Sequence, residues 1–224
     1  MGKEKTEQKL DVSDQIAGFM QKHRKPLLIL LVLIAAGVAG SSAFFLIRGV
    51  LEKKAIAAVE EFERRKSEIE SSGEAAKSEK ETALLEEINA FAPSTFGYAA
   101  ARSYSLAADI YYSRSEWGKA EEAWVAAARK APKIYLAPVS LFNAAAAAEE
   151  QGKLEESIDY YRRSLTFAGI YPAAARTRFN IGRICETRND KTGAVESYRE
   201  LIEKNPDSNW AKLAQSRLIF LESK

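Results

Sequence analysis

A repeat of 37 residues constrains the fold more than any other feature of this chain. Small and aromatic positions recur at that spacing between residues 101 and 208. They are the small residues Ala108, Ala145 and Gly182, the small residues Ala120, Ser157 and Ala194, the aromatic residues Trp124, Tyr161 and Tyr198, and the shared position of Tyr111, Ala148 and Cys185. Small residues let two helices cross closely, and an aromatic side chain fills the space beside the crossing. The pattern therefore predicts helix–turn–helix units stacked in a row.

The limits of these units follow from the residues between the helical stretches. Short polar turns lie at 114–116, 151–153 and 188–190, and Pro132, Gly169 and Pro206 close the units. We predict units at about 101–134, 138–171 and 175–208, a capping helix at 209–222, and a repeat domain over 93–224. No sustained apolar–polar alternation indicates a strand, and good helix formers dominate the composition. The expected fold class is all-α.

Several residues in each unit follow the pattern of a known repeat family. They are Ala107, Ala108, Tyr111, Ala120, Trp124, Ala127 and Pro132 in the first unit, Ala144, Ala145, Gly152, Ser157, Tyr161 and Ser164 in the second, and Ile181, Gly182, Ala194, Tyr198 and Pro206 in the third. On these residues the chain resembles the tetratricopeptide repeat (TPR) family. Its spacing of 37 exceeds the family's period of about 34, which indicates longer junctions between units. The resemblance implies an α-solenoid that binds peptides or proteins.

The resemblance also implies where a partner would bind. In TPR proteins the first helix of each unit lines a concave groove. By that pattern the groove would hold Arg102, Ser105, Asp109 and Tyr112, then Val139, Phe142, Asn143 and Glu149, and finally Arg176, Phe179, Arg183 and Glu186. Aromatic and arginine side chains are good interface anchors, although each is also an ordinary residue of a half-exposed helix. The family's clamp for chaperone tails is not expected, because Asp109 would repel a terminal carboxylate.

An uncharged segment of 21 residues, Leu27 to Ile47, lies near the N-terminus. As a helix it would cover roughly 30 Å, the hydrocarbon thickness of a bilayer. Basic residues flank it on both sides, and we predict one transmembrane helix at 26–50. A cleaved secretory signal is the alternative. The apolar run, however, continues past the small residues at 37–39, and the long leader carries acids, which favours an uncleaved anchor.

The segments on either side of the predicted span are also expected to be helical. Residues 1–25 form a tail whose apolar face from Val12 to His23, after a possible N-cap at Ser13, predicts an amphipathic juxtamembrane helix. His23 is interpreted as an interfacial residue. Residues 51–92 are predicted to be a helical connector and half-repeat, with a helix at Glu79–Ala92 that ends at Pro93.

The orientation and association of the span are less constrained by the sequence. Basic residues are almost equally frequent on its two sides, so the positive-inside signal is nearly balanced. We expect the short tail in the cytosol and the repeats outside it. Ala35, Ala39 and Ala43 recur at a spacing of four, which would let a second membrane helix approach, although small residues are common in such helices. A homo-oligomer is therefore one of the states to test.

The composition points away from several functional classes. A single cysteine and a single histidine exclude an intramolecular disulfide, a cysteine-rich zinc site and a two-histidine metal site. The net charge of +2 gives no reason to expect nucleic acid. Cys185 is interpreted as a core thiol, and paired acids such as Glu121 and Glu122 as a solvated face. We expect no enzyme, no cofactor and no metal.

The order of the parts suggests a cellular setting. A short leader, one span, a long helix and helical repeats are similar in layout to the YfgM-type proteins of bacteria. That resemblance implies an inner-membrane protein with a periplasmic repeat domain, associated with the translocon and periplasmic chaperones. The expected function is a membrane-anchored scaffold that recruits proteins for translocation, folding or envelope assembly. A structural protein that only associates with itself is the alternative.

Overall fold

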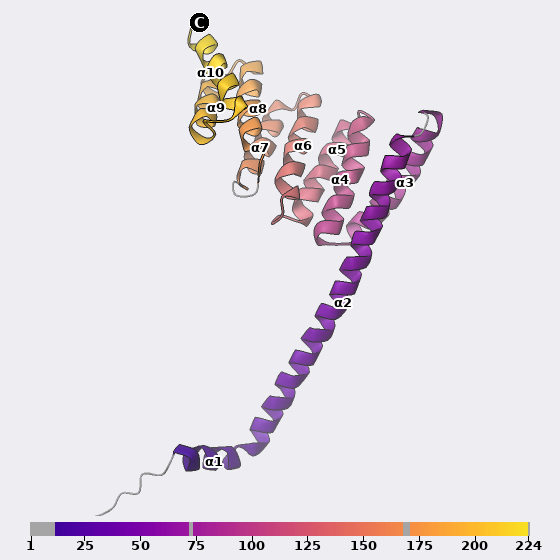
Figure 1. Cartoon of the computed structure of the whole chain (residues 1–224), viewed down its shortest axis with the longest axis vertical. Helices are drawn as coiled ribbons and strands as arrows, with labels where there is room; N and C mark the ends of the chain where they lie inside the picture. The colour runs from indigo at the N-terminus through magenta and orange to yellow at the C-terminus, as the bar shows by residue number, and fades with distance from the viewer. Residues whose placement is uncertain (1–11, 72–73, 168–170, 224) are drawn as a thin grey trace, which may run out of the picture. The chain divides into compact units, whose positions relative to one another are not determined.

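The structure is a computed structural model that describes residues 12–71, 74–167 and 171–223. Within these ranges every regular element is an α-helix, and Figure 1 shows them in chain order. They are α1 (Val12–Lys22), α2 (Arg24–Glu70), α3 (Glu74–Ser94), α4 (Gly97–Ser113), α5 (Trp117–Lys130), α6 (Leu136–Glu150), α7 (Leu154–Leu165), α8 (Ala174–Thr187), α9 (Lys191–Lys204) and α10 (Asn209–Glu222). The all-α fold class expected from the sequence is confirmed.

The chain divides into two compact units, Met1–Lys53 and Lys54–Lys224. The division falls inside α2, so this single helix contributes residues to both units. The sequence had suggested a boundary between a span and a connector at about residue 50, and the helix is unbroken there. Those domain limits stay predictions, because continuity of a helix does not decide where a membrane ends.

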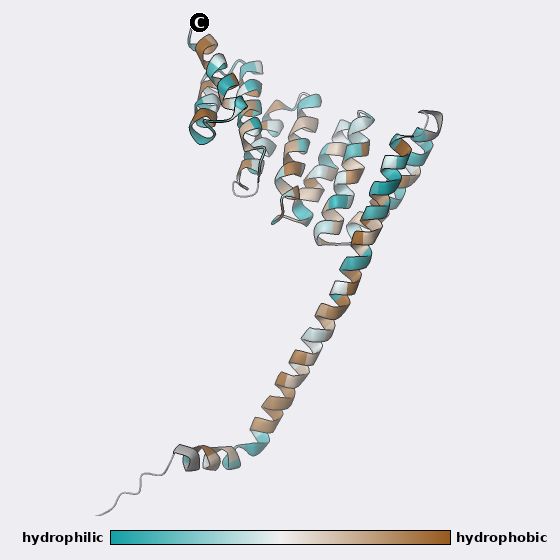
Figure 2. Cartoon of the chain, in the orientation of Figure 1, coloured by the Kyte–Doolittle hydropathy of each residue, from teal (hydrophilic) through white to brown (hydrophobic). Residues whose placement is uncertain are grey.

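The first unit contains α1 and the N-terminal part of α2. Large apolar side chains along α2 from Leu28 to Leu51 are exposed, and Figure 2 shows this stretch as a hydrophobic run. Among the described residues α2 is the one helix long and apolar enough to cross a membrane, although a signal sequence has the same properties. Helix α1 already includes Ser13, which the sequence analysis had placed before it as the N-cap.

The second unit begins with a hairpin made by the C-terminal part of α2 and by α3. The rings of Phe62 and Phe91 lie 5.5 Å apart, and Arg65 pairs with Glu87 at 2.6 Å. Helix α3 is longer than the predicted helix at 79–92 and continues one residue past Pro93. A proline keeps a helical φ and removes one N–H donor, so in the last turn it ends a helix within a residue or two.

The remaining helices form two layers. Helices α4 and α5, α6 and α7, and α8 and α9 pack as pairs, and α10 packs on α8 and α9. We call α2 (from Lys54), α4, α6, α8 and α10 the first layer, and α3, α5, α7 and α9 the second layer. One buried cluster runs from α4 to α10, another joins α2, α3 and α4, and Tyr111 packs against both. The hairpin and the repeats therefore share a continuous interior.

The three polar turns expected inside the units are confirmed, and each closes its first-layer helix in the same way. Ser115, Gly152 and Asn189 have φ angles of 61°, 73° and 60°. The next residue in each turn donates its N–H back to the carbonyl oxygens of Tyr111, Ala148 and Cys185, at 2.9, 2.9 and 2.8 Å. This is the Schellman arrangement, in which one left-handed residue redirects the chain into the second helix.

Candidate partner-binding surface

All twelve residues predicted to line the groove lie on the first layer, and eight of them carry the aromatic, amide or charged groups that we expect to bind a partner. Arg102, Asp109 and Tyr112 lie on α4, Phe142 and Asn143 on α6, and Arg176, Phe179 and Arg183 on α8. Arg176 is exposed, and the other seven are half-buried. None is sealed inside the core, so the first layer presents a surface with aromatic, amide and charged groups.

Ion pairs join successive helices of this layer. Arg102 of α4 hydrogen-bonds Glu63 of α2, and Arg183 of α8 donates two hydrogen bonds to Glu149 of α6 at 2.6 and 2.7 Å. Arg217 of α10 binds Glu186 of α8. The positive charges of Arg102 and Arg183 are therefore already balanced by carboxylates of the protein itself. Both residues hold neighbouring helices in position, in addition to lying on the surface that would face a partner.

The junction between α4 and α6 differs from the others. There the hydroxyl oxygens of Ser105 and Ser140 lie 3.4 Å apart in a buried contact, and within the described part of the chain no ion pair joins α4 to α6. Ser105, expected in the groove, is buried. Burial also raises the pKa of Asp109 above its ordinary value, although Lys66 and Arg102 partly offset this effect. Asp109 thus interacts with basic residues of the layer itself.

Aromatic residues of the first layer stack on those of the second at the repeat spacing. The ring centroids of Phe142 and Tyr161 are 5.2 Å apart, and those of Phe179 and Tyr198, 37 positions later, are 5.5 Å apart. Trp210 of α10 lies 5.2 Å from Phe179. Both phenylalanines pack against the core and are half-buried, so part of each ring stays accessible.

Arg176 is the one predicted groove residue with an uncommitted charge. Its guanidinium lies over the Phe142 ring at 5.0 Å, and among the described residues no carboxylate pairs with it. Beside it, Asn180 donates a hydrogen bond to the Tyr161 hydroxyl at 3.1 Å, and burial raises the pKa of that hydroxyl to about 12. An exposed cation held over an aromatic ring suits a partner with an acidic group.

Comparison with known proteins identifies the repeats. The family model described as "Tetratricopeptide repeat" matches residues 105–175, and a second model of the same description matches 175–208. A TPR repeat-containing protein of Treponema pallidum (strain Nichols) is 35% identical over 219 residues, covering 91% of each chain. The chain belongs to the tetratricopeptide repeat family. The TPR resemblance inferred from the sequence is confirmed.

Solved structures share the TPR fold at low sequence identity. A crystal structure of nearly identical TPR-like repeats from a putative kinesin light chain of Podosopora anserina has a TM-score of 0.55 and 13% identity. It covers 76% of this chain and 86% of that one. A crystal structure of a variant of those repeats gives a TM-score of 0.52 at 10% identity, with coverage of 76% and 85%. At these identities the likeness shows the α-solenoid fold alone.

The predicted repeat-core residues of this TPR chain lie where the layers cross. Ala108, Ala120, Ala145, Ser157, Ala194, Trp124, Tyr161, Tyr198 and Cys185 are buried, Gly182 is buried, and Tyr111 is half-buried. A Cβ atom on Gly182 would lie 2.5 Å from the Tyr198 ring. The hydroxyl of Ser157 has no hydrogen-bond partner among the described residues. Position 157 therefore requires a small side chain and not a hydrogen-bonding one, because this hydroxyl bonds none of the described residues.

The groove residues were predicted from the three repeats alone, so the prediction did not include residues of the flanking helices α2 and α10. Glu63 and Lys66 of α2, and Trp210 and Arg217 of α10, belong to the same surface as the predicted residues. One signal could have found them at the C-terminal end. Arg176 and Arg183 precede Trp210 and Arg217 by 34 positions, the usual TPR period of about 34.

Glu121 and Cys185, two titratable residues outside this surface, are both buried. Glu121, interpreted from the sequence as solvated, is only 6% exposed, so that interpretation is wrong. Its carboxylate accepts hydrogen bonds from Gln151, Lys153 and Tyr160 at 2.8, 3.1 and 3.0 Å, which join α5 to α7. Cys185 is buried, and burial raises the pKa of its thiol.

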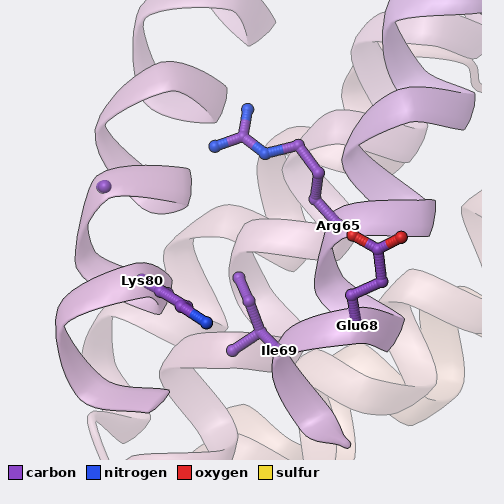
Figure 3. Close-up of a pocket in the computed structure, with 5 residues that line it drawn as sticks. Arg65, Glu68, Ile69 and Lys80 are labelled. Atoms are coloured by element: carbon purple, nitrogen blue, oxygen red, sulfur yellow. The ribbon is translucent and has the colours of Figure 1, made fainter. Parts of the chain in front are cut away.

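A hollow on the α2–α3 hairpin also has a structural explanation. In Figure 3, Arg65, Glu68 and Ile69 of α2 and Lys80 of α3 surround it. Its charges are mixed, and Arg65 already pairs with Glu87. Among the described residues no three histidine, cysteine or acidic side chains gather to hold a metal.

Proposed function

We propose that this TPR protein is a membrane-anchored scaffold that holds partner proteins on its first layer. The observation that carries the proposal is Arg176, an exposed cation stacked on Phe142 with no carboxylate of the described chain beside it. Asn180, one turn after Arg176 on α8, is bonded to Tyr161, and Asn143 follows Phe142 on α6. Cations and aromatic rings at the centre of a surface are typical interface anchors.

The proposed anchor is the apolar stretch of α2. Its side chains are exposed in the protein, and exposed apolar surface of this length is stabilised by lipid. Residues 1–25 would form the juxtamembrane tail, 26–50 the span, 51–92 the connector and half-repeat, and 93–224 the TPR domain. The repeats would lie outside the cytosol of a bacterial inner membrane. Translocation, periplasmic folding or envelope assembly would supply the partners, and the protein would not be an enzyme.

Site-specific crosslinking in cells tests the binding surface. Arg176→Glu should lower the yield of crosslinked partner roughly fivefold or more, since interface anchors cost over about 1 kcal/mol when replaced. Arg162→Glu is the matched control, because Arg162 is exposed on the second-layer helix α7. If Arg176→Glu, and also alanine at Phe142 and Phe179, leave the captured proteins unchanged, this surface does not bind them.

A second candidate is self-association without a dedicated ligand. The spacing of Ala35, Ala39 and Ala43 within α2 favours it, because small residues on one helix face permit close helix packing. Mass measurement of the full chain in detergent separates the two candidates. A monomer at all concentrations contradicts self-association, whereas an oligomer that persists with Arg176→Glu supports it.

A further inference from the structure

Charge is segregated along the repeats in a way that the net charge hides. The stretches 88–108, 123–148 and 160–185 contain nine lysine or arginine residues and no aspartate or glutamate. Each stretch comprises the C-terminal part of a second-layer helix, the following loop and most of the next first-layer helix. The acids, including Glu116, Glu150 and Glu155, instead gather near the turns inside the units.

The structure brings the ends of these helices to one edge, which we call the inter-unit edge. It is formed by the α3–α4 loop and the α5–α6 loop, together with the C-terminal end of α7 and the N-terminal end of α8 (Figure 1). The Lys130 ammonium at the end of α5 donates to the carbonyl oxygens of Pro93, in the last turn of α3, and of Thr95, in the α3–α4 loop, both at 3.3 Å. The loops of successive units are therefore neighbours.

This edge exposes aromatic side chains together with cations. Phe96, Tyr98 and Tyr135 are 44%, 37% and 57% exposed. Arg129 and Arg163 flank a cavity of about 270 Å³ that is otherwise lined mainly by apolar side chains, including Leu141 and Phe167. Amphipathic aromatic rings beside basic side chains are typical of the interface between a bilayer and water.

Some cations of the edge are neutralised and others are not. Arg102 pairs with Glu63, Arg163 with Asp159 at 3.5 Å, and Arg178 with Glu200 at 3.0 Å. By contrast, Arg129 and Lys133 are exposed and have no carboxylate partner among the described residues. Acids of the flanking helices, such as Glu60 of α2 and Asp207 before α10, lie at the ends of the array. Arg162 on α7 and Arg176 on α8 are likewise exposed with no carboxylate partner among the described residues, so the uncommitted positive charge spans the second and third of these stretches.

The chain also enters the second unit near this edge. Arg102, in the second turn of α4, bonds Glu63 of α2, and Tyr98 has Glu60 and Glu63 among its charged neighbours. Later in α4, Asp109 has Lys66 and Glu70 of α2 among its charged neighbours, so α2 runs from its Lys54 end beside the start of α4 toward the end of α4. From Lys54 to Glu60 an α-helix rises about 9 Å. Within the second unit, the Lys54 end of α2 therefore lies on the side of the inter-unit edge, and its Glu70 end lies on the side of the turns inside the units, which form the opposite edge.

We propose that the inter-unit edge binds the surface of an anionic lipid bilayer. Arg129 and Lys133 contact negatively charged headgroups, while Phe96, Tyr98 and Tyr135 enter the interfacial region. The inference rests on the proposed membrane anchor, because tethering raises the effective concentration of the edge at the bilayer and so strengthens a weak attraction. The first layer stays available for a protein partner, since its groove residues are separate from Arg129 and Lys133.

Fluorescence quenching in vesicles tests this contact with the full chain. Ser94 and Ser113 are a matched pair of exposed labelling sites, because each hydroxyl donates to the carbonyl three residues earlier in the last turn of its helix. Ser94→Cys places a fluorophore at the inter-unit edge, and Ser113→Cys places one at the opposite edge. Cys185 is buried, and labelling of the unmodified chain checks that it does not react.

In vesicles of phosphatidylcholine and phosphatidylglycerol with a nitroxide on the headgroup, the label at 94 should be quenched and the label at 113 should not. Quenching should be lost in phosphatidylcholine alone, in high salt, and in Arg129→Glu/Lys133→Glu. It should persist in Lys119→Glu/Lys191→Glu, which reverses two exposed charges at the opposite edge. Equal quenching at both sites, or quenching at 94 that survives Arg129→Glu/Lys133→Glu, overturns the proposal.

Two further outcomes separate this proposal from its alternatives. If the label at 94 stays unquenched while Arg129→Glu/Lys133→Glu abolishes capture of an acidic protein, the edge binds protein and the lipid proposal is wrong. Extraction of the full chain by alkaline carbonate would contradict the anchor, whatever the label reports. A chain that resists extraction but shows no quenching contradicts the edge proposal alone.

Discussion

At the scale of single residues, the three turns show how one backbone requirement is met by three side chains. Ser115, Gly152 and Asn189 occupy the same left-handed position of the Schellman turn, 37 residues apart. Glycine adopts this conformation without steric cost, asparagine tolerates it, and serine does so least readily. The turns are therefore equal in geometry and unequal in conformational strain.

This difference predicts that substitutions at Ser115 and Gly152 change the free energy of unfolding in opposite directions. Ser115→Gly should raise the free energy of unfolding by about 1 kcal/mol, because it removes a strained Cβ. Gly152→Ala should lower it by about the same amount, although a Cβ there meets no atom within 4 Å. Urea unfolding of the full chain in detergent, followed by circular dichroism, measures both. Changes of the same sign would show that contacts, and not φ, control these turns.

At the scale of helices, the crossing of each pair was predictable and the contacts between pairs were not. The spacing of Ala108, Ala145 and Gly182 predicts a close crossing, because this depends on residues about 16 positions apart in one unit. Contacts between successive first-layer helices join Glu63 to Arg102, Glu149 to Arg183 and Glu186 to Arg217, over 39, 34 and 31 residues. Their spacing varies because the junctions differ in length, so no single period predicts them.

The candidate site was predictable only as far as the family pattern reaches. That pattern assigned twelve residues to the first helices of three units, and all twelve lie on α4, α6 and α8 of the first layer. It could not show that Arg102 and Arg183 are occupied by Glu63 and Glu149, whereas Arg176 is not. That distinction depends on which side chains of a neighbouring unit come within reach, which is a property of the packed solenoid.

The tightest crossing predicts a local overpacking effect. Gly182→Ala should lower the free energy of unfolding by about 1–3 kcal/mol, because the new Cβ would lie 2.5 Å from the Tyr198 ring. Alanine's better helix propensity, about 1 kcal/mol, offsets only part of this. Gly118→Ala is the control, since its Cβ would meet Gln151 at an ordinary 3.6 Å. Equal unfolding midpoints for the two variants would mean that Tyr198 moves aside freely.

At the scale of the whole molecule, the second unit is a row in which each repeat contacts mainly its neighbours. Local unfolding of one helix should therefore spread only to the adjacent helices. The C-terminal end offers a way to observe this. Helix α10 is held by Trp210 against Phe179 and by Arg217 on Glu186, which also accepts a hydrogen bond from the Tyr198 hydroxyl at 2.6 Å. The hydrogen bond from Arg217 is the main reason that the pKa of Glu186 lies below its ordinary value.

Acid should therefore loosen the row from its C-terminal end. A lowered carboxylate pKa stabilises the fold above the ordinary glutamate value of about 4.3, and this contribution is lost as the pH falls through the lower folded value. Because Arg217 is partly exposed, the contribution is about 1 kcal/mol or less. Hydrogen exchange, corrected for the intrinsic rate, should show α10 opening below about pH 4 while α4 and α5 stay protected. Glu186→Gln should produce the same opening at pH 7, and simultaneous opening of all the helices would show that the row unfolds as one cooperative body.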